Sequence, residues 1–381
     1  MALRIANHLS ESHRVIVCTT AAPRPKYGNF QILNNLRART DEDVKALNDV
    51  DVDIWLAMNA GYAAIAERLL KPVVAYFHGN DFLNPWVVST PVLMKILSKM
   101  PLIGQFWYGK RRTYAQRKIG AGIQSLGCVL TNSLNTETII QQSYPQCPNV
   151  SLCAPGVEDR FFQTESDNDA SSQIVNLLTV SRLQKATRRK NIDGVLRALA
   201  RLKGHMEFAY SIVGHGDDME NLKSLSDSLG LSDRVTFHGR VDDDELLRLY
   251  RWANLFVLPA KSSPVDVEGF GIVYLEANAS GVPVLCSAAG GALDAVVDGR
   301  TGIVLPGSEP GQIADGILRF VDARANFRKD DLREFARSFT WKIAAIRIEA
   351  LILNSYDSFQ RSSSEQSIGM NRVPSRAATT G

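Results

Sequence analysis

The sequence predicts an α/β protein with two doubly wound, parallel-sheet domains that face each other across a cleft. Two observations support this. The chain has 381 residues, more than one domain usually holds. Short apolar runs alternate with longer amphipathic stretches, and this alternation occurs in both halves. Sheets of this kind bind ligands at the carboxyl ends of their strands, so facing domains would share one site.

The apolar runs are rich in Val, Ile and Leu, as in strands that are buried on both faces. The strands expected in the first half are 13–20, 51–58, 72–79, 127–133 and 150–156. Those expected in the second half are 174–183, 206–216, 234–241, 254–260, 282–291 and 301–307.

A polar segment without aliphatic residues, 163–173, predicts a linker between the two domains. The expected division is an N-terminal domain, the linker, a C-terminal domain, a C-terminal helix and a polar, aperiodic tail that we expect to be disordered. Their bounds are 1–162, 163–173, 174–340, 341–359 and 360–381.

Composition excludes several classes of protein. With 45% hydrophobic and 22% charged residues and a net charge of +3, the chain is typical of a globular protein and lacks the basic excess of a nucleic-acid binder. Its five cysteines form no C-x-x-C pair, which favours a reducing compartment. No run reaches the ~18 apolar residues of a membrane span, and no signal peptide is evident. We expect a cytoplasmic protein.

The stretch EGFGIVYLEANASGVPV, 268–284, predicts a turn, then a helix, then a strand. Gly269 and Gly271 allow a ligand to approach the backbone closely, and the helix N-terminus behind them favours phosphate. Glu268 precedes this end and Glu276 lies deeper, and carboxylates accept hydrogen bonds from pairs of sugar hydroxyls. Two glutamates at this spacing also occur by chance on solvated helix surfaces, so the glycines carry the argument.

These residues resemble the E-x7-E signature of retaining GT-B glycosyltransferases of family 4. The resemblance is densest over 259–306 and continues in TVSRLQKATRRKNIDGVLRAL, SIVGHGDDMENLKSL and RVTFHGRVDDDELLRLYRWANLFVLPA. It is looser in FHGND and CAPGVEDRFF of the first half. DVEGFGIVYLEA is most similar to mannosyltransferases that act on phosphatidylinositol. The resemblance implies two Rossmann-like domains and transfer of a hexose from a nucleotide-diphospho-sugar, with GDP-mannose favoured and UDP-sugars left open.

The resemblance also assigns roles in the C-terminal domain. Glu276 would bind the ribose hydroxyls and Glu268 the transferred sugar, while Arg182 and Lys190 would neutralise the diphosphate. The sequence shows no Asp-x-Asp at the end of a strand, so these cations and the helix end would replace a metal, and no cofactor is expected. A solvated basic loop is the alternative for KATRRK. Further donor contacts are expected at Gly214, Gly216, Val241, Phe270, Gly271, Ile272 and Val273.

In the first half, His78 follows a predicted buried strand, where the resemblance implies that it faces the donor sugar. Asp81 would lie near the acceptor, and Asp294 would be either a helix-start residue or an acceptor-side contact. The alternative is structural, since Asn80 or Asp81 could simply begin a helix. Similar enzymes begin with a strand and a glycine-rich loop before the helix that ALRIANHLSESHRV resembles, so we expect a late start, a partial sequence or a shortened copy.

Residues 91–118 hold seven basic residues and no acidic one, interleaved with apolar and aromatic residues. Such a segment could contact an anionic membrane, which would suit a glycan or lipid-linked acceptor and a peripheral location at the inner face. A basic helix at the mouth of the cleft is the alternative. Two other functions stay open: a sugar-nucleotide 2-epimerase, and a non-catalytic nucleotide-sugar binder.

Overall fold

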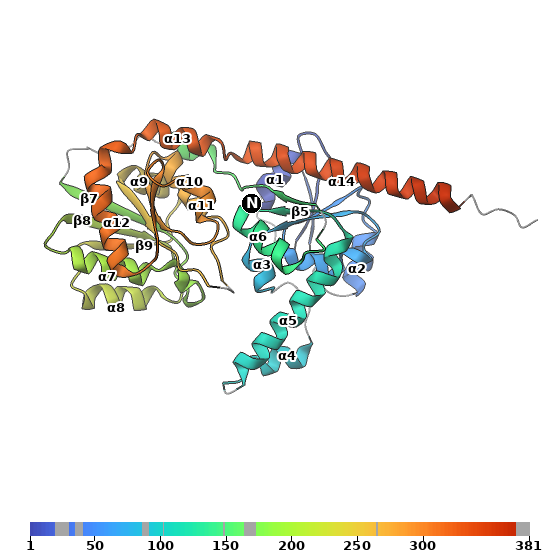
Figure 1. Cartoon of the computed structure of the whole chain (residues 1–381), viewed down its shortest axis with the longest axis horizontal. Coiled ribbons are helices and arrows are strands. Elements are labelled where there is room, and N and C mark those ends of the chain that lie inside the picture. The colour runs from blue at the N-terminus through green and yellow to red at the C-terminus, as the bar shows by residue number, and fades with distance from the viewer. Residues whose placement is uncertain are drawn as a thin grey trace, which may run out of the picture.

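The structure is a computed structural model that describes residues 1–19, 30–34, 41–85, 91–101, 103–147, 149–163, 173–263 and 266–370, with side chains up to residue 365. Figure 1 shows two α/β lobes side by side. The expected linker falls mostly on 164–172, outside the described residues.

The C-terminal lobe contains a six-stranded parallel sheet in the order β12-β11-β10-β7-β8-β9. Its strands are β7 (Ile174–Val180), β8 (Glu207–Val213), β9 (Val235–Gly239), β10 (Leu255–Leu258), β11 (Val284–Ser287) and β12 (Gly302–Leu305), each inside a predicted range. The helical elements are η4 (Lys185–Lys190), α7 (Ile192–Leu202), α8 (Met219–Ser228), α9 (Asp243–Trp252), α10 (Ile272–Ala279), α11 (Ala292–Ala295), α12 (Pro310–Ala323), η5 (Arg324–Asn326) and α13 (Lys329–Arg337).

This strand order fixes where a ligand can bind. The chain runs outward from β7 through β8 to β9, then returns to the other side of β7 and continues through β10, β11 and β12. The order therefore reverses between β7 and β10, and the loops that follow these two strands part there. Such a switch point creates a crevice at the carboxyl ends of the strands.

The N-terminal lobe contains a four-stranded sheet, β3-β4-β5-β6, and a separate pair, β1-β2, all parallel. Its strands are β1 (Ile16–Thr19), β2 (Gln31–Asn34), β3 (Trp55–Ala57), β4 (Val73–Phe77), β5 (Leu126–Thr131) and β6 (Val150–Leu152). The strand β2 was not among those expected. The helical elements are α1 (Ala2–Leu9), α2 (Asp41–Asn48), η1 (Ala60–Arg68), α3 (Asn80–Leu83), α4 (Val92–Leu97), α5 (Gly104–Gly122), η2 (Ile123–Ser125) and α6 (Leu134–Ser143). The next element, η3 (Asp159–Gln163), packs on the C-terminal lobe, where Phe161 contacts Tyr250.

The last helix, α14 (Trp341–Met370), begins at the C-terminal lobe and crosses to the N-terminal lobe (Figure 1). Ile348 and Ile352 pack there with Val74 and Leu130 of the four-stranded sheet. The helix passes the expected boundary at 359, and 360–370 are helical rather than part of the predicted tail. No proline interrupts this stretch, and its Ser, Gln and Glu residues are compatible with a helix. Residues 371–381 lie outside the described part.

Replacing Ile348 by Ala should destabilise the protein by about 2–5 kcal/mol, because the side chain is 1% exposed and its removal leaves a cavity. Ile346 on the same helix is 55% exposed, so Ile346→Ala should cost about 0.5 kcal/mol or less. Thermal unfolding followed by circular dichroism compares the two midpoints. Equal midpoints would contradict the packing of α14 on the N-terminal lobe.

Candidate active site

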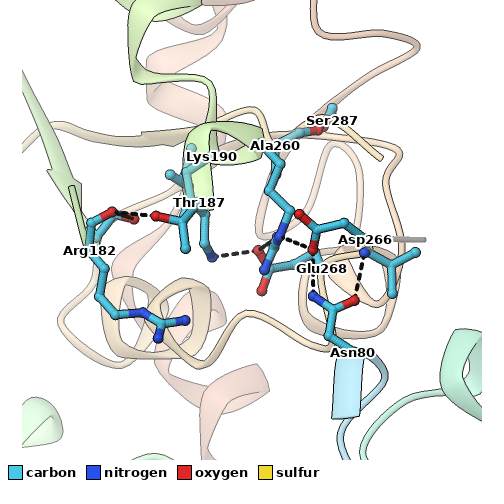
Figure 2. Close-up of polar contacts among 12 residues, drawn as sticks. Asn80, Arg182, Thr187, Lys190, Ala260, Asp266, Glu268 and Ser287 are labelled. Atoms are coloured by element: carbon cyan, nitrogen blue, oxygen red, sulfur yellow. Dashed lines mark hydrogen bonds and ion pairs between the residues drawn. The ribbon is translucent and has the colours of Figure 1, made fainter. Parts of the chain in front are cut away.

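The candidate site lies at the switch point of the C-terminal sheet. The loop after β7 carries Arg182 and leads into η4, which ends in Arg189 and Lys190. The loop after β10 carries Glu268 and leads into α10. Because both strands end at the same edge, cations from one loop meet the carboxylate from the other (Figure 2).

Glu268 is buried and bound by two cations. Its Oε2 accepts a hydrogen bond from Nζ of Lys190 at 2.5 Å and another from Nη1 of Arg189 at 2.9 Å. Burial alone would raise the pKa of Glu268, but the charges of Lys190 and Arg189 outweigh it and hold the pKa below its ordinary value. Glu268 is therefore ionised at neutral pH, as a partner of these cations.

A left-handed residue holds the basic turn against β10. Asn191 follows η4 with φ of 62°, a conformation that non-glycine residues adopt rarely. Its Nδ2 donates to the carbonyls of Pro259 at 3.0 Å and Ser308 at 2.7 Å. These bonds fix η4 beside the end of β10, which places Arg189 and Lys190 over the Glu268 loop.

Arg182 lies near this pair without joining it. Its carbonyl accepts a hydrogen bond from Oγ1 of Thr187 at 3.1 Å, and in Figure 2 its guanidinium lies away from Glu268. Burial lowers the pKa of Lys190, and the positive charges of Arg189 and Arg182 act in the same direction against Glu268. The structure thus brings Lys190 and Glu268 together and leaves Arg182 close to Lys190.

The helix N-terminus has the predicted form. Gly271 precedes α10 with φ of 89°, and a Cβ there would lie 2.3 Å from the ring of Tyr274. Only glycine fits this position. Ile272 and Val273 form the first turn, where backbone amides have no acceptor within the helix. Phe270 is buried against Phe339, with ring centroids 5.9 Å apart, and this contact fixes the entry to the helix.

The pKa of Glu276 is shifted in the opposite direction from that of Glu268. Its carboxyl is buried, and Oε2 accepts a hydrogen bond from the hydroxyl of Tyr250 at 3.0 Å. Burial raises the pKa of Glu276 to about 7, against the effect of the Tyr250 hydrogen bond and with a further rise from the charge of Glu158. Near neutral pH this carboxyl can therefore be protonated or ionised.

The two predicted glycines of the β8 loop lie against the loop that carries Arg182. A Cβ on Gly214 would lie 1.7 Å from the carbonyl oxygen of Ser181, and one on Gly216 would lie 2.0 Å from that of Leu183. These glycines permit close backbone packing beside Arg182. Val241 follows β9 and packs against the apolar cluster around β10 and α10.

On the N-terminal lobe, His78 and Asp81 belong to one turn after β4. The Asp81 carboxylate accepts hydrogen bonds from the backbone amides of His78 at 2.8 Å and Ala60 at 2.7 Å. Nε2 of His78 lies 3.2 Å from the carbonyl of Met58. Burial raises the pKa of Asp81, which the charge of His78 and the amide hydrogen bonds oppose. Asp81 thus joins the turn after β4 to the start of η1, and among the described residues no side chain caps α3.

Asp294 connects the lobes. Its Oδ2 accepts a hydrogen bond from the amide of Leu134 at 3.1 Å, at the N-terminus of α6. An acidic side chain is favourable at that end of a helix. Burial raises the pKa of Asp294, while amides of α6 oppose the shift.

Five polar residues of the site were not predicted as site residues from the sequence: Asn80, Arg189, Asn191, Tyr250 and Asp266. Arg189 precedes the predicted Lys190, and Asn80 lies in the motif FHGND. Both could therefore have been predicted from their neighbours in the sequence. Tyr250 and Asp266 carry no signal in the sequence. The hydrogen bond of Tyr250 to Glu276 joins α9 to α10, and the hydrogen bond of Asn80 to Asp266 joins the two lobes, so both contacts depend on the tertiary fold.

Comparison with known proteins identifies the family. Residues 167–339 match the family described as Glycosyl transferases group 1. The chain is 32% identical over 287 residues to a GDP-mannose-dependent alpha-(1-6)-phosphatidylinositol monomannoside mannosyltransferase of Mycobacterium tuberculosis, covering 72% of this chain and 68% of that protein. This chain belongs to the glycosyl transferases group 1 family. It is a glycosyltransferase, as the sequence predicted.

Other relatives of this group 1 glycosyltransferase support the same family and fold. A D-inositol 3-phosphate glycosyltransferase of Mycolicibacterium smegmatis is 31% identical over 233 residues, covering 59% of this chain and 51% of that protein. Among solved structures, sucrose-phosphate synthase from Thermosynechococcus elongatus superposes with a TM-score of 0.70 at 19% identity, over 93% of this chain and 92% of that one. Anabaena HepE in complex with UDP superposes with a TM-score of 0.69 at 18% identity, over 93% of this chain and 95% of that one. The predicted GT-B fold, with two Rossmann-like domains, is confirmed.

Two features are absent from the described part of this glycosyltransferase. Within the described ranges, no helix has both the length and the apolar character that a bilayer crossing requires. In the same part of the chain, no group of three or more His, Cys, Asp or Glu side chains is placed to hold a metal ion.

Glu276 should make stability depend on pH. A carboxyl whose pKa is raised by folding contributes stability below its unfolded pKa, near 4.5, and loses it as pH rises through about 7. Between pH 4.5 and 8, the free energy of unfolding of the wild type should therefore fall by up to about 3 kcal/mol relative to that of Glu276→Gln. Urea denaturation at several pH values measures this, with the exposed Glu334→Gln as control. A constant difference between wild type and Glu276→Gln across this range would contradict the raised pKa.

Proposed function

We propose that this glycosyltransferase transfers a hexose, with retention at the anomeric carbon and without a metal ion, from a nucleotide-diphospho-sugar to a hydroxyl of a glycan or lipid-linked acceptor. The observation that carries the proposal is the meeting of Lys190, Arg189 and Glu268 at the switch point, beside the N-terminus of α10. This arrangement has the charges that a sugar diphosphate requires.

The cations would stabilise the leaving group. As the glycosidic bond breaks, negative charge develops on the diphosphate oxygen, and preorganised donors at that point lower the barrier. Lys190 and Arg182 are the proposed partners of the diphosphate, together with the amides of Ile272 and Val273 and the neighbouring Gly214 and Gly216. The diphosphate would replace Glu268 as the partner of Lys190. Two cations and a helix end are the basis for proposing metal independence.

The two glutamates would hold the two ends of the donor. Glu268 would accept hydrogen bonds from hydroxyls of the transferred sugar once Lys190 turns to the diphosphate. Glu276 would accept those of the ribose, and the backbone around Val241 would contact the base. The reaction breaks the bond between the anomeric carbon and the diphosphate oxygen and forms one to the acceptor oxygen. The acceptor proton passes to the leaving diphosphate on the same face of the sugar.

His78 is the proposed contribution of the N-terminal lobe to the donor sugar, since its turn touches the Glu268 loop. A Cβ on Gly269 would lie 2.5 Å from the carbonyl oxygen of His78, so the two loops meet at backbone distance. Asp81 would fix the His78 turn, and Asp294 would fix α6 on the acceptor side. The amide hydrogen bonds of both carboxylates support these roles.

Relatives favour GDP-mannose as donor and a phosphatidylinositol mannoside or similar glycolipid as acceptor. The Mycobacterium tuberculosis relative is a GDP-mannose-dependent enzyme that acts on a phosphatidylinositol monomannoside. The Mycolicibacterium smegmatis relative is named for D-inositol 3-phosphate, which makes a free inositol phosphate the second candidate acceptor.

The helices α4 and α5 provide a surface for a lipid-linked acceptor. They project from the N-terminal lobe in Figure 1 and expose Val92, Leu93, Ile96 and Phe106 at 69%, 63%, 57% and 62%. The seven basic residues of 91–118 accompany these apolar side chains. Exposed apolar side chains among cations favour peripheral binding to an anionic membrane, which we propose at its cytoplasmic face.

Lys190→Ala and Arg182→Ala should each lower kcat/KM by about 100-fold or more, because each removes a positive charge from the developing diphosphate. Lys223→Ala, which removes a half-exposed lysine of α8 that pairs with Glu220, should change kcat/KM by less than about twofold. The assay offers GDP-mannose and UDP-glucose with phosphatidylinositol mannoside or inositol phosphate, with and without EDTA. Inhibition by EDTA, or an inverted product by NMR, would overturn the mechanism.

Leu93→Ser together with Phe106→Ser should abolish most sedimentation with anionic vesicles, because both side chains are exposed on the proposed membrane surface. The matched control is Leu318→Ser with Val321→Ser, two exposed apolar residues on the C-terminal lobe. Vesicles of phosphatidylglycerol and phosphatidylcholine are compared with phosphatidylcholine alone. Binding that does not depend on anionic lipid would count against the assignment.

A further inference from the structure

Asn80 connects the two lobes through both ends of its side chain. It is the first residue of α3 in the N-terminal lobe. Its Nδ2 donates to Oδ1 of Asp266 at 2.5 Å, and its Oδ1 accepts from the amide of Val267 at 2.9 Å. Two consecutive residues of the Glu268 loop are therefore bound by one carboxamide from the opposite lobe (Figure 2).

Arg189 binds the same loop from the other side. Its Nε lies 2.8 Å from Oδ1 of Asp266, the oxygen that Asn80 contacts, and its Nη1 lies 2.9 Å from Oε2 of Glu268. One guanidinium thus holds both acidic side chains of the loop. A planar guanidinium suits such a double contact better than an ammonium group does.

The backbones of the two lobes lie close together at this contact. A Cβ on Gly79, next to Asn80, would lie 3.5 Å from Cα of Gly269. The amide of Gly291 also donates to the carbonyl of Glu268 at 2.8 Å, which holds the loop from a third side. His78 belongs to the same turn as Asn80, so the contact joins the His78 turn to the Glu268 loop.

We propose that Asn80, Asp266 and Arg189 form an interlobe clamp that positions Glu268 toward the donor sugar. The role of Glu268 toward the sugar rests on the proposed function. When the diphosphate takes Lys190, Arg189 remains bound to Asp266 and Glu268 and prevents the loop from following Lys190. The three residues are positioning residues, because their contacts are with protein and not with the reacting atoms.

The clamp requires an amide at position 80. An aspartate there keeps an acceptor for the amide of Val267 but has no donor for Asp266, and two carboxylates would face each other at hydrogen-bond distance. Like charges at that separation repel and would open the contact. The double exchange, Asn80→Asp with Asp266→Asn, restores one donor and one acceptor between positions 80 and 266. Arg189 then faces a neutral amide at position 266 in place of a carboxylate.

The test compares Asn80→Asp, Asp266→Asn, the double exchange and the exposed control Asn354→Asp. Asn80→Asp should lower kcat about 30-fold while the Kd of GDP or UDP alone, which the C-terminal lobe binds, changes less than about twofold. The double exchange should recover about 10-fold of the kcat lost in Asn80→Asp, which a general loss of stability would not produce. The control should match wild type.

A second measurement needs no donor or acceptor. Asn80→Asp should accelerate amide hydrogen exchange in peptides that contain 78–80 and 266–269, and the double exchange should slow it again. Unchanged exchange in Asn80→Asp, a kcat within threefold of wild type, or a double exchange no more active than Asn80→Asp would each overturn the clamp. If no tested donor is used, the proposed donor fails while the exchange data still decide on the clamp.

Discussion

The buried carboxylate of Glu268 needs positive partners, and this requirement organises the C-terminal half of the site. An ionised carboxylate removed from water without a partner is strongly unfavourable. Lys190 and Arg189 supply its partners, and Asn191 holds their turn against β10. The left-handed Asn191, the glycines before α10 and the reversal of strand order all serve to bring this anion and these cations together.

The two glutamates show how one short segment can hold two different carboxyl groups. Glu268 lies before α10 beside two cations, so it stays ionised, whereas Glu276 lies inside the helix with a tyrosine hydroxyl, so burial dominates and raises its pKa to about 7. The difference comes from neighbours far away in the sequence, Lys190 and Tyr250. The spacing of the glutamates alone does not determine it.

Local signals in the sequence predicted most of the fold. Continuous apolar runs placed every strand of both larger sheets, and Gly271 placed the start of α10, because buried strands and helix ends depend on nearby residues. The contacts of Asn80 with Asp266 and of Asp294 with α6 could not be predicted, because they depend on how the lobes face each other. The strand β2 is four residues long, and the extension of α14 is mostly polar, so neither shows the periodicity that reveals an element.

The return of α14 to the N-terminal lobe has a consequence for motion. Within the described residues the chain passes between the lobes twice, once near Val157 and once near Phe339, and Val157 pairs there with Thr340. Two adjacent crossings restrict twisting and sliding of one lobe against the other. Rotation about the line that joins the two crossings is then the easiest motion. Opening for product release should therefore follow a single arc, with its hinge close to the contact of Phe270 with Phe339 at the entry to α10.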